Sequence, residues 1–197
     1  NQLDNLNLSN NIYLGYLNCG ENNITSLDVS MLDLYDLRCQ NNAISTINLD
    51  NNYSLEWLSC YNNNLQNINL TVNTNLIVLN VGNVSSQPSI YNNDLNSLDL
   101  SNNCNITTFY SKGNANLECI QVCDISAANN WNTQNIDTQH FFSIDCNYTA
   151  TNEGSERNQK IISIKDIYGR ESDIHTNSFL FYIYQNGRVK KRIILDN

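Results

Sequence analysis

Three stretches of this sequence repeat one pattern: LGYLNCGENNI at residues 14–24, LYDLRCQNNAI at residues 34–44 and LEWLSCYNNNL at residues 55–65. Each has leucine at its first and fourth positions, cysteine at its sixth, asparagine at its ninth, and leucine or isoleucine at its eleventh. The successive cysteines are 20 and 21 residues apart. Because a fixed period in this range is the sequence signature of a solenoid of repeats, we expect each copy to form one turn of a coil.

A second apolar motif lies between successive copies of the first. Because alternate residues of a strand point to opposite sides, a short strand at each leucine-x-cysteine step would bury Leu17 and Cys19 and expose Asn18 and Gly20. A fourth copy of the first motif has Val81 at the cysteine position, so that position requires a small apolar side chain. We therefore expect the cysteines of the ladder to be buried, reduced thiols. The second motif consists of Ile24, Leu27 and Val29; Ile44, Ile47 and Leu49; Leu65, Ile68 and Leu70; and Leu95, Leu98 and Leu100.

Asparagine accounts for 40 of the 197 residues. In the repeats, Asn22, Asn42 and Asn63 each follow a cysteine by three residues. We expect their amides to turn inward and to bond backbone groups that the bend of the coil leaves unpaired. This role accounts for much of the composition without a disordered, low-complexity chain.

The net charge of -9 is distributed unevenly along the chain. Residues 1–150 contain two basic side chains, Arg38 and Lys112, and the other eight follow residue 150. This shift indicates a domain boundary, and the acidic first part argues against nucleic acid as a partner, since phosphate binding requires a basic surface. The sequence contains no apolar run long enough to span a bilayer and no signal peptide. It also starts within a repeat, so we expect the natural chain to begin earlier.

The repeating unit, LxxLxCxxNxLxxLDLS, resembles the cysteine-ladder leucine-rich repeats of about 21 residues that occur in internalin-type surface proteins and in many secreted bacterial proteins. The resemblance covers residues 1–146. It implies a β-rich, right-handed solenoid whose repeats occupy residues 1–115 and whose C-terminal cap occupies residues 116–147. It also implies an exported, non-enzymatic protein of the cell surface, without a cofactor, that acts in adhesion or binds a protein or glycan.

Two departures from the period occur in the later repeats. The step from the first motif to the second spans five residues in the early copies but 14 in the fourth, so nine residues have been inserted. Loops inserted on one side of a solenoid often bind ligands, which makes Gln87, Pro88 and Tyr91 candidate binding residues. After Ser111 the apolar positions resume at once with Leu117, so we expect the array to end there.

The resemblance also implies a use for the four remaining cysteines. Cys119 and Cys146 occupy positions that carry cysteines in the resembling caps, so we expect a disulfide between them. Cys104 and Cys123 stand where those caps have other residues, and their joint appearance suggests a second disulfide; the alternative is two unrelated thiols. Zinc is disfavoured, because the chain has a CxxxC step in place of the usual CxxC pairs. The side chains expected to cover the last coil are Trp131, Phe141, Phe142 and Ile144.

The outward positions of the expected strands form the candidate binding face. Tyrosine and tryptophan at such positions supply contact area with a polar edge, as recognition surfaces do. The alternative is that these rings only shield neighbouring strands. The candidate residues are Tyr16, Asp36, Arg38, Trp57, Tyr61, Tyr110 and Lys112.

The last part of the chain has a different pattern. After a polar linker at residues 148–159, alternating apolar residues predict strands near 160–168, 178–184 and 188–195, the last two joined at Asn186 and Gly187, a strong hairpin signal. Residues 160–197 resemble the C-terminal sorting region of type IX secretion cargo. A simple β appendage is the alternative. The residues that carry the resemblance are Tyr168, Gly169, Arg170, Lys190, Lys191 and Arg192.

The sequence contains no glycine-rich phosphate loop, no HExxH and no GxSxG, so we expect no enzymatic activity and no metal. Asp28 and Asp99 are interpreted as turn-bonding residues and His140 as part of the cap. Two other functions stay open. The chain could be an accessory or cargo subunit of an outer-membrane complex, with β-barrel export or uptake proteins as partners, or the targeting module of a larger enzyme.

Overall fold

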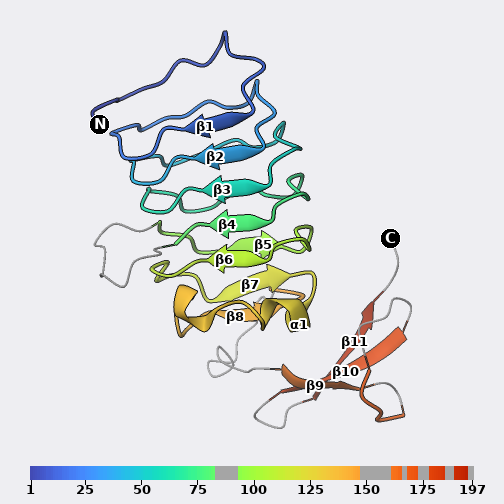
Figure 1. Cartoon of the computed structure of the whole chain (residues 1–197). Coiled ribbons are helices and arrows are strands. Elements are labelled where there is room, and N and C mark those ends of the chain that lie inside the picture. Colours follow the sequence, from blue (N-terminus) through green and yellow to red (C-terminus); the bar gives the residue numbers. More distant parts are fainter. Residues whose placement is uncertain (83–92, 147–160, 166–167, 173–177, 185–188, 195–197) are drawn as a thin grey trace. The chain divides into compact units, whose positions relative to one another are not determined.

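The chain forms two units, residues 1–147 and 148–197, and each is described by itself. The computed structural model describes residues 1–82, 93–146, 161–165, 168–172, 178–184 and 189–194. The first unit is a β-solenoid with little helix, and the second contains a small antiparallel sheet (Figure 1). The predicted fold class is thus confirmed.

The first motif of each coil forms one strand of a parallel sheet. The residue at the centre of each three-residue strand points into the solenoid and is buried, from Leu17 in the first coil to Phe109 in the fifth. Leu37, Leu58 and Leu79 lie in register between them. The strands, in their spatial order, are β1 (Tyr16–Asn18), β2 (Asp36–Arg38), β3 (Trp57–Ser59), β4 (Val78–Asn80) and β6 (Thr108–Tyr110).

A second parallel sheet forms on the half-repeats, in the order β5 (Leu98–Leu100), β7 (Cys119–Val122) and β8 (Phe141–Ser143). Its register places Leu98 beside Ile120 and Leu100 beside Val122. The second motif therefore occurs once more after Ser111. Leu117, Ile120 and Val122 are the second motif of the fifth coil, and they follow Ser111 after nearly the same step as in the early coils.

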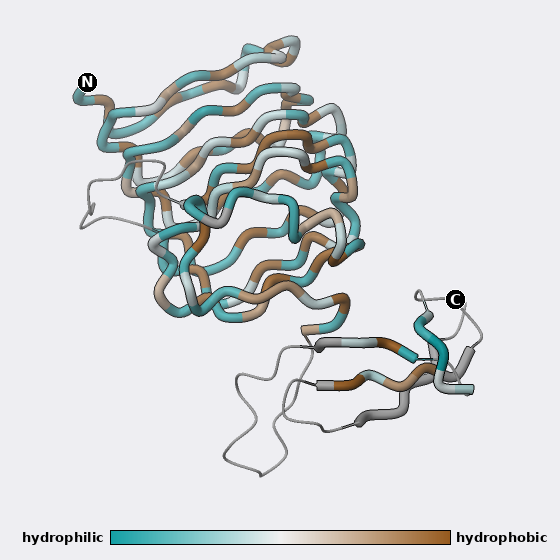
Figure 2. The backbone as a smooth tube through the Cα atoms, turned by 60° about the horizontal axis from the view of Figure 1, so that its bottom comes forward, coloured by the Kyte–Doolittle hydropathy of each residue, from teal (hydrophilic) through white to brown (hydrophobic). Residues whose placement is uncertain are grey.

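The interior of the solenoid is a continuous apolar core, in which hydrophobic segments recur from coil to coil (Figure 2). Cys19, Cys39 and Cys60 are buried free thiols in this core, as expected. Burial raises the pKa of Cys19 to about 11 and that of Cys60 to about 12. Burial, together with the two neighbouring thiols, raises the pKa of Cys39 well above its ordinary value. The thiols thus stay protonated and unreactive at neutral pH.

The asparagine ladder that the sequence predicts is present. The Asn63 side-chain Nδ2 donates to the carbonyl oxygens of Cys39 and Cys60, at 3.0 Å each, and its Oδ1 accepts from the Ile44 N–H at 3.0 Å. Each such amide joins its own coil to the preceding one. The members of this ladder are Asn22, Asn42, Asn63, Asn93 and Asn114.

A second asparagine ladder, which the sequence analysis did not identify, runs through the turns that follow the half-repeats. Asn52, Asn73 and Asn103 are buried, and each donates to a carbonyl oxygen at the end of the preceding half-repeat. The first coil has Leu32 at this position, and its turn is one residue shorter. The two ladders hold opposite bends of the coil, which makes both sheets rigid supports.

The cap continues the coil with residues that do not repeat. Helix α1 (Ile125–Ala128) begins at Asp124, whose carboxylate accepts from the N–H groups of Ser126 and Ala127. The short 3₁₀ helix η1 (Thr133–Asn135) follows, and the carbonyl oxygen of Asn135 accepts from two N–H groups at the edge of the first sheet. This segment therefore covers a sheet edge that a further coil would otherwise pair.

Aromatic rings close the end of the core. The ring of Trp131 lies 4.7 Å from that of Phe109 and 5.2 Å from that of Phe142, centroid to centroid, and its Nε1 donates to the Ile106 carbonyl oxygen. Phe141, expected to contribute, is instead 37% exposed, because adjacent residues of β8 point to opposite sides.

The second unit contains strands β9 (Ile161–Lys165), β10 (Ser178–Tyr184) and β11 (Val189–Ile194) in the antiparallel order β11-β10-β9, as the sequence predicts. Leu180 and Tyr182 of the central strand are buried. The linker, and the turn at Asn186 and Gly187, lie outside the described residues.

Candidate functional site

Four of the predicted binding residues form one cluster on the outer face of the first sheet. Arg38 donates through Nε and Nη2 to the two carboxylate oxygens of Asp36, at 3.0 and 2.9 Å. Its guanidinium carbon lies 4.8 Å from the centroid of the Trp57 ring and 5.7 Å from that of Tyr16. The Arg38 charge is thus paired with a carboxylate and flanked by aromatic rings of both neighbouring coils.

The strand register explains this geometry. Tyr16, Asp36 and Trp57 are aligned across β1, β2 and β3, and Arg38 stands two residues beyond Asp36 on the same side of its strand. Tyr16 and Trp57 keep 43% and 39% of their surface exposed. The cluster is therefore an open surface with aromatic edges and little free charge, on a backbone fixed by parallel pairing on both sides of β2.

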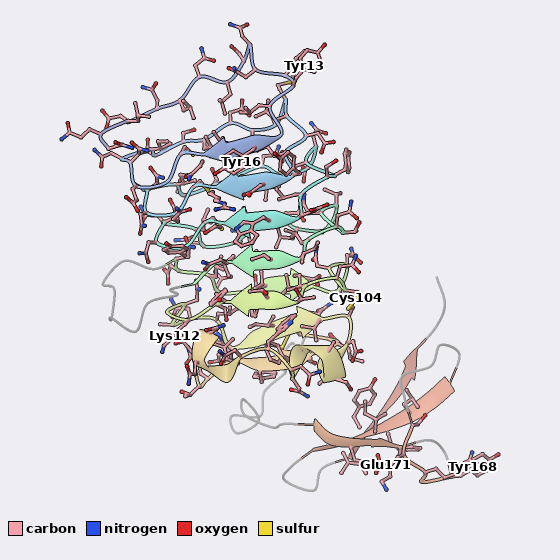
Figure 3. The ribbon with its side chains drawn as sticks, viewed as in Figure 1. Tyr13, Tyr16, Cys104, Lys112, Tyr168 and Glu171 are labelled. Carbon is pink, nitrogen blue, oxygen red and sulfur yellow. A yellow bond between two sulfur atoms is a disulfide. The ribbon has the colours of Figure 1, made fainter. Side chains whose placement is uncertain are left out.

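The remaining predicted residues of this face do not join the cluster. Tyr61 follows the end of β3 and is half-buried, whereas Tyr110 lies on β6, beyond the intervening strand β4. Lys112 is exposed on the side of the solenoid at which the strands end, and Tyr13 lies on the opposite side (Figure 3). Gln87, Pro88 and Tyr91, the candidates in the insertion, lie outside the described residues.

Sequence analysis missed a second exposed patch, on the side from which the strands start. The residues directly before β1, β2, β3 and β4 form a column that is joined by backbone hydrogen bonds. The N–H groups of Tyr35, Glu56 and Ile77 donate to the carbonyl oxygens of Gly15, Tyr35 and Glu56, respectively, at 2.8–2.9 Å. The turns before these strands add three more exposed side chains. We call this surface the edge patch; its members are Tyr13, Asp33, Tyr35, Tyr53, Glu56 and Ile77.

The signal for the edge patch is present in the sequence. Its column is the second position of the first motif, which the repeat leaves free to vary. Tyrosine and isoleucine at such a position are more apolar than an outer position requires. Tyr35 also packs on the preceding coil, since a Cβ on Gly15 would meet its ring at 2.7 Å.

Where the cap meets the last coil, a buried serine and a buried histidine lie in contact, and a partly exposed aspartate lies beside the histidine. Nδ1 of His140 lies 3.0 Å from the Ser111 hydroxyl, and its Nε2 lies 3.4 Å from the Asn114 carbonyl oxygen and 3.6 Å from Oδ2 of Asp137. These contacts fit the tautomer with its proton on Nε2, so that Nδ1 accepts from Ser111. Burial lowers the pKa of His140, and the Asn114 carbonyl and the Asp137 carboxylate oppose this shift.

This arrangement joins the cap to the last coil and does not suit nucleophilic catalysis. Ser111 is fully buried, and the side chain of His140 has no exposed surface, so no substrate reaches the hydroxyl. Ser111 occupies the ladder position of the cysteines, one coil beyond Val81. His140 thus provides the partner that a hydroxyl requires inside the core.

Both predicted disulfides are present in the structure, and both belong to the cap region. One joins Cys119 to Cys146, with their Cα atoms 5.8 Å apart, and the other joins Cys104 to Cys123, at 5.7 Å. In the described part of the chain, no group of three or more histidine, cysteine, aspartate or glutamate side chains is placed to hold a metal ion. The same residues include no helix that is both long and apolar enough to cross a membrane.

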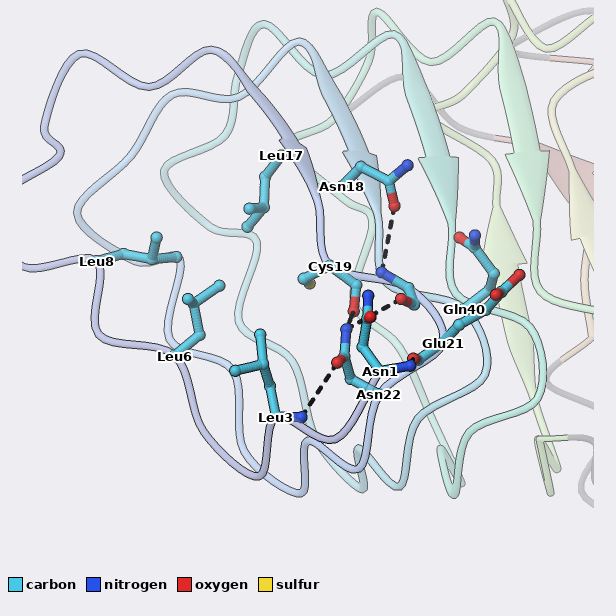
Figure 4. Close-up of a pocket in the computed structure, with 11 residues that line it drawn as sticks. Asn1, Leu3, Leu6, Leu8, Leu17, Asn18, Cys19, Glu21, Asn22 and Gln40 are labelled. Atoms are coloured by element: carbon cyan, nitrogen blue, oxygen red, sulfur yellow. Dashed lines mark hydrogen bonds between the residues drawn. The ribbon is translucent and has the colours of Figure 1, made fainter.

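A pocket of about 470 Å³ lies at the N-terminal end of the solenoid (Figure 4). Its apolar lining consists of Leu3, Leu6 and Leu8 together with Leu17 and Cys19 at β1. An uncovered end of any solenoid presents an apolar interior and a strand edge in this way. We therefore assign no ligand to this pocket.

In the second unit, the predicted turn residues are exposed. The Arg170 guanidinium carbon lies 5.0 Å from the centroid of the Tyr168 ring, and Gly169 between them has φ of +79°, which glycine adopts without strain. Lys190 and Arg192 are paired through the β11 backbone with Tyr182 and Leu180 of β10. Lys191 is paired in the same way with Phe181.

No protein-family model matches this chain. A search of curated proteins finds no match either. Among solved structures, the chain is similar to one described as the functional domain of InlJ from Listeria monocytogenes, which includes a cysteine ladder. The two are 29% identical, with a TM-score of 0.48, and the match covers 61% of this chain and 27% of that one. This chain thus matches little more than a quarter of that domain's length.

Proposed function

We propose that the solenoid is a non-enzymatic binding module of an exported surface protein and that it contacts a protein or glycan through the outer face of its first sheet. The observation that carries this proposal is the cluster at Arg38, where two partly exposed rings flank a cation already paired with Asp36. Such rings present a large contact area at a low cost in conformational entropy.

The rigidity of the support favours the same function. Both bends of the coil are held by buried amides, so the rings of Tyr16 and Trp57 stand on a backbone that does not need to order on binding. The pairing of Arg38 with Asp36 removes free charge from the cluster, and an uncharged surface with aromatic and polar edges suits protein side chains or sugars.

Export is proposed on two grounds. Disulfides form and persist in oxidising compartments, and the cap contains two of them. The resemblance of residues 160–197 to a type IX sorting region supports that route, and the exposed turn at Tyr168, Gly169 and Arg170, followed by a hairpin of β10 and β11, suits recognition by export machinery.

Binding is tested with the variant Trp57→Ala/Tyr61→Ala on an array of extracellular proteins and glycans. We expect the affinity for the ligand of the natural chain to fall by about tenfold or more, as it does when aromatic anchors are truncated. The matched control is Tyr168→Ala, which removes an exposed ring from the other unit and should bind normally. Unchanged binding by a folded Trp57→Ala/Tyr61→Ala variant would contradict the proposal.

The route is tested by deleting residues 160–197 in a host that has type IX machinery. The truncated chain should stay in the periplasm, whereas the full chain should reach the surface or the medium. Recovery of the truncated chain at the surface would exclude sorting by this tail and would leave the binding proposal unaffected.

A further inference from the structure

Several of the exposed large apolar side chains of the solenoid belong to the edge patch. Tyr13 is 95% exposed, Tyr53 56%, Tyr35 53% and Ile77 42%, and all four belong to the edge patch. Surfaces that expose several large apolar groups together mark interaction sites more often than single exposed residues do. The edge patch is also continuous with the proposed binding face, because Tyr35 and Glu56 directly precede Asp36 and Trp57 in the chain.

The charges of this surface have one sign. Residues 1–82 contain seven acidic side chains and one basic side chain, Arg38, so their formal charge is 1 − 7 = −6. Arg38 is already paired with Asp36. Within the edge patch, Glu56 is exposed, and Asp33 is exposed while it accepts from the Ser54 N–H and hydroxyl, at 2.9 and 2.8 Å. The patch thus joins aromatic and aliphatic surface to two carboxylates that no cation of residues 1–82 neutralises.

We infer that the edge patch binds a basic segment of another protein, whose lysine or arginine side chains lie along the tyrosine rings and pair with Glu56 and Asp33. Lysine and arginine stems pack on apolar surface while their charged heads reach outward, and their heads are attracted to ring faces and carboxylates. Tyrosine is enriched and lysine depleted at protein interfaces, and residues 1–111 contain no lysine. The hydroxyl groups of a neutral glycan would donate to the two carboxylates, but such a glycan would bring no positive charge to pair with them.

This inference rests on the proposed function, because it extends the same surface and names its partner as a basic protein segment. The test is a selection from a library of random peptides displayed on phage, with the full chain immobilised. We expect the enriched peptides to be net positive and to contain large apolar residues. Their affinity should fall as the salt concentration rises from about 50 to about 300 mM, because salt screens the attraction between exposed charges.

Two double variants with equal changes of charge locate the site. Asp33→Asn/Glu56→Gln should lower the affinity for the enriched peptides by about fivefold, the size expected for two partly exposed ion pairs. The control, Asp28→Asn/Asp99→Asn, removes two charges from the half-repeats, where Asn48 and Asn69 already form the same turn bond. It should weaken them by less than about twofold. Tyr35→Ala, which removes no charge, should weaken them as well.

Selection of neutral or acidic peptides would overturn the inference, and so would equal weakening by the two double variants, which would indicate attraction to the net charge alone. Failure of the inference is distinct from failure of the proposed function. An array ligand that is lost in Trp57→Ala/Tyr61→Ala but is bound normally by Asp33→Asn/Glu56→Gln overturns the basic-partner inference and supports the binding face.

Discussion

The middle coils and the C-terminal cap differ in how they pair the polar groups that a bend leaves inside the solenoid. In the coils, every bend leaves backbone groups that an asparagine of the next coil bonds, as Asn63 does for Cys39, Cys60 and Ile44. In the described residues of the cap no further coil follows, and groups that do not repeat pair with the last coil: His140 contacts Ser111 and Asn114. The coil therefore depends on a repeated contact and the cap on single ones.

This difference predicts where a substitution has the largest effect. An interior asparagine serves two coils at once, so its loss disturbs both. A group of the cap serves one position, but no second copy of it exists. The ladder position tests the contrast directly, since it holds cysteine in three coils, valine in the fourth and serine in the fifth.

The largest effect is expected for Asn63→Ala. The substitution leaves the carbonyl oxygens of Cys39 and Cys60 and the N–H of Ile44 without their side-chain partner in a buried site. We expect a loss of about 3 kcal/mol or more in the free energy of unfolding, measured by urea denaturation. The control Asn69→Ala, at an exposed asparagine, should cost less than about 1 kcal/mol. Equal losses would mean that the inward amides are not special.

The repeated part of the fold was predictable because each position is present several times in the sequence. Leu17, Cys19 and Asn22 recur in order, and one physical role explains every copy. The contact of Ser111 with His140 was not predictable, because neither residue recurs and 29 residues separate them in the chain. The edge patch was missed for a different reason, since its column varies from glycine to tyrosine, glutamate and isoleucine and shows no period.

A second effect is expected at the ladder position itself. Cys60→Ser places a hydroxyl in an apolar site that has no counterpart of His140, and we expect a loss of about 2 kcal/mol. Cys60→Val should cost less than about 1.5 kcal/mol, because Val81 occupies the same position one coil further on. Denaturation midpoints of the two variants check this. If serine is tolerated as well as valine, His140 is not what makes Ser111 acceptable in the fifth coil.

Acid should loosen the cap before the coils. The pKa of His140 is lowered by burial in the folded state, so the unfolded chain, with a pKa near 6.5, binds the proton more readily. The stability that neutral His140 contributes is therefore present above about pH 6.5 and is lost as the pH falls through its folded pKa. Protonation at Nδ1 would also oppose the N–H of Asp137, 3.4 Å away.

The measurement is the midpoint of urea unfolding at about pH 7.5 and at about pH 5.5, one above and one below the ordinary histidine pKa. The natural chain should be less stable at the lower pH, and His140→Gln should lose most of this dependence, although it is less stable at pH 7.5. A pH dependence that persists in full in His140→Gln would assign it to other groups of the chain.

The smallest expected effect is a gain at the start of the solenoid. Glu21 has φ of 59°, and the equivalent residues of the next two coils, Asn41 and Asn62, have 55° and 51°. Asparagine tolerates this left-handed region better than glutamate does. Asparagines at this position also bond from coil to coil, since Nδ2 of Asn62 donates to Oδ1 of Asn41 at 2.7 Å. Glu21→Asn should therefore stabilise by about 0.5–1 kcal/mol, measured by urea denaturation.

Glu21→Gln separates the backbone effect from the charge effect. Glutamine removes the charge of Glu21 but keeps the longer side chain and its poor fit to positive φ, so its stability should stay within about 0.5 kcal/mol of the natural chain. If glutamine stabilises as much as asparagine does, the gain comes from reduced repulsion in an acidic solenoid. If only asparagine stabilises, the second and third coils carry a residue that suits the left-handed turn, and the first coil does not. The contrast between repeated and unique contacts then extends to both ends of the array.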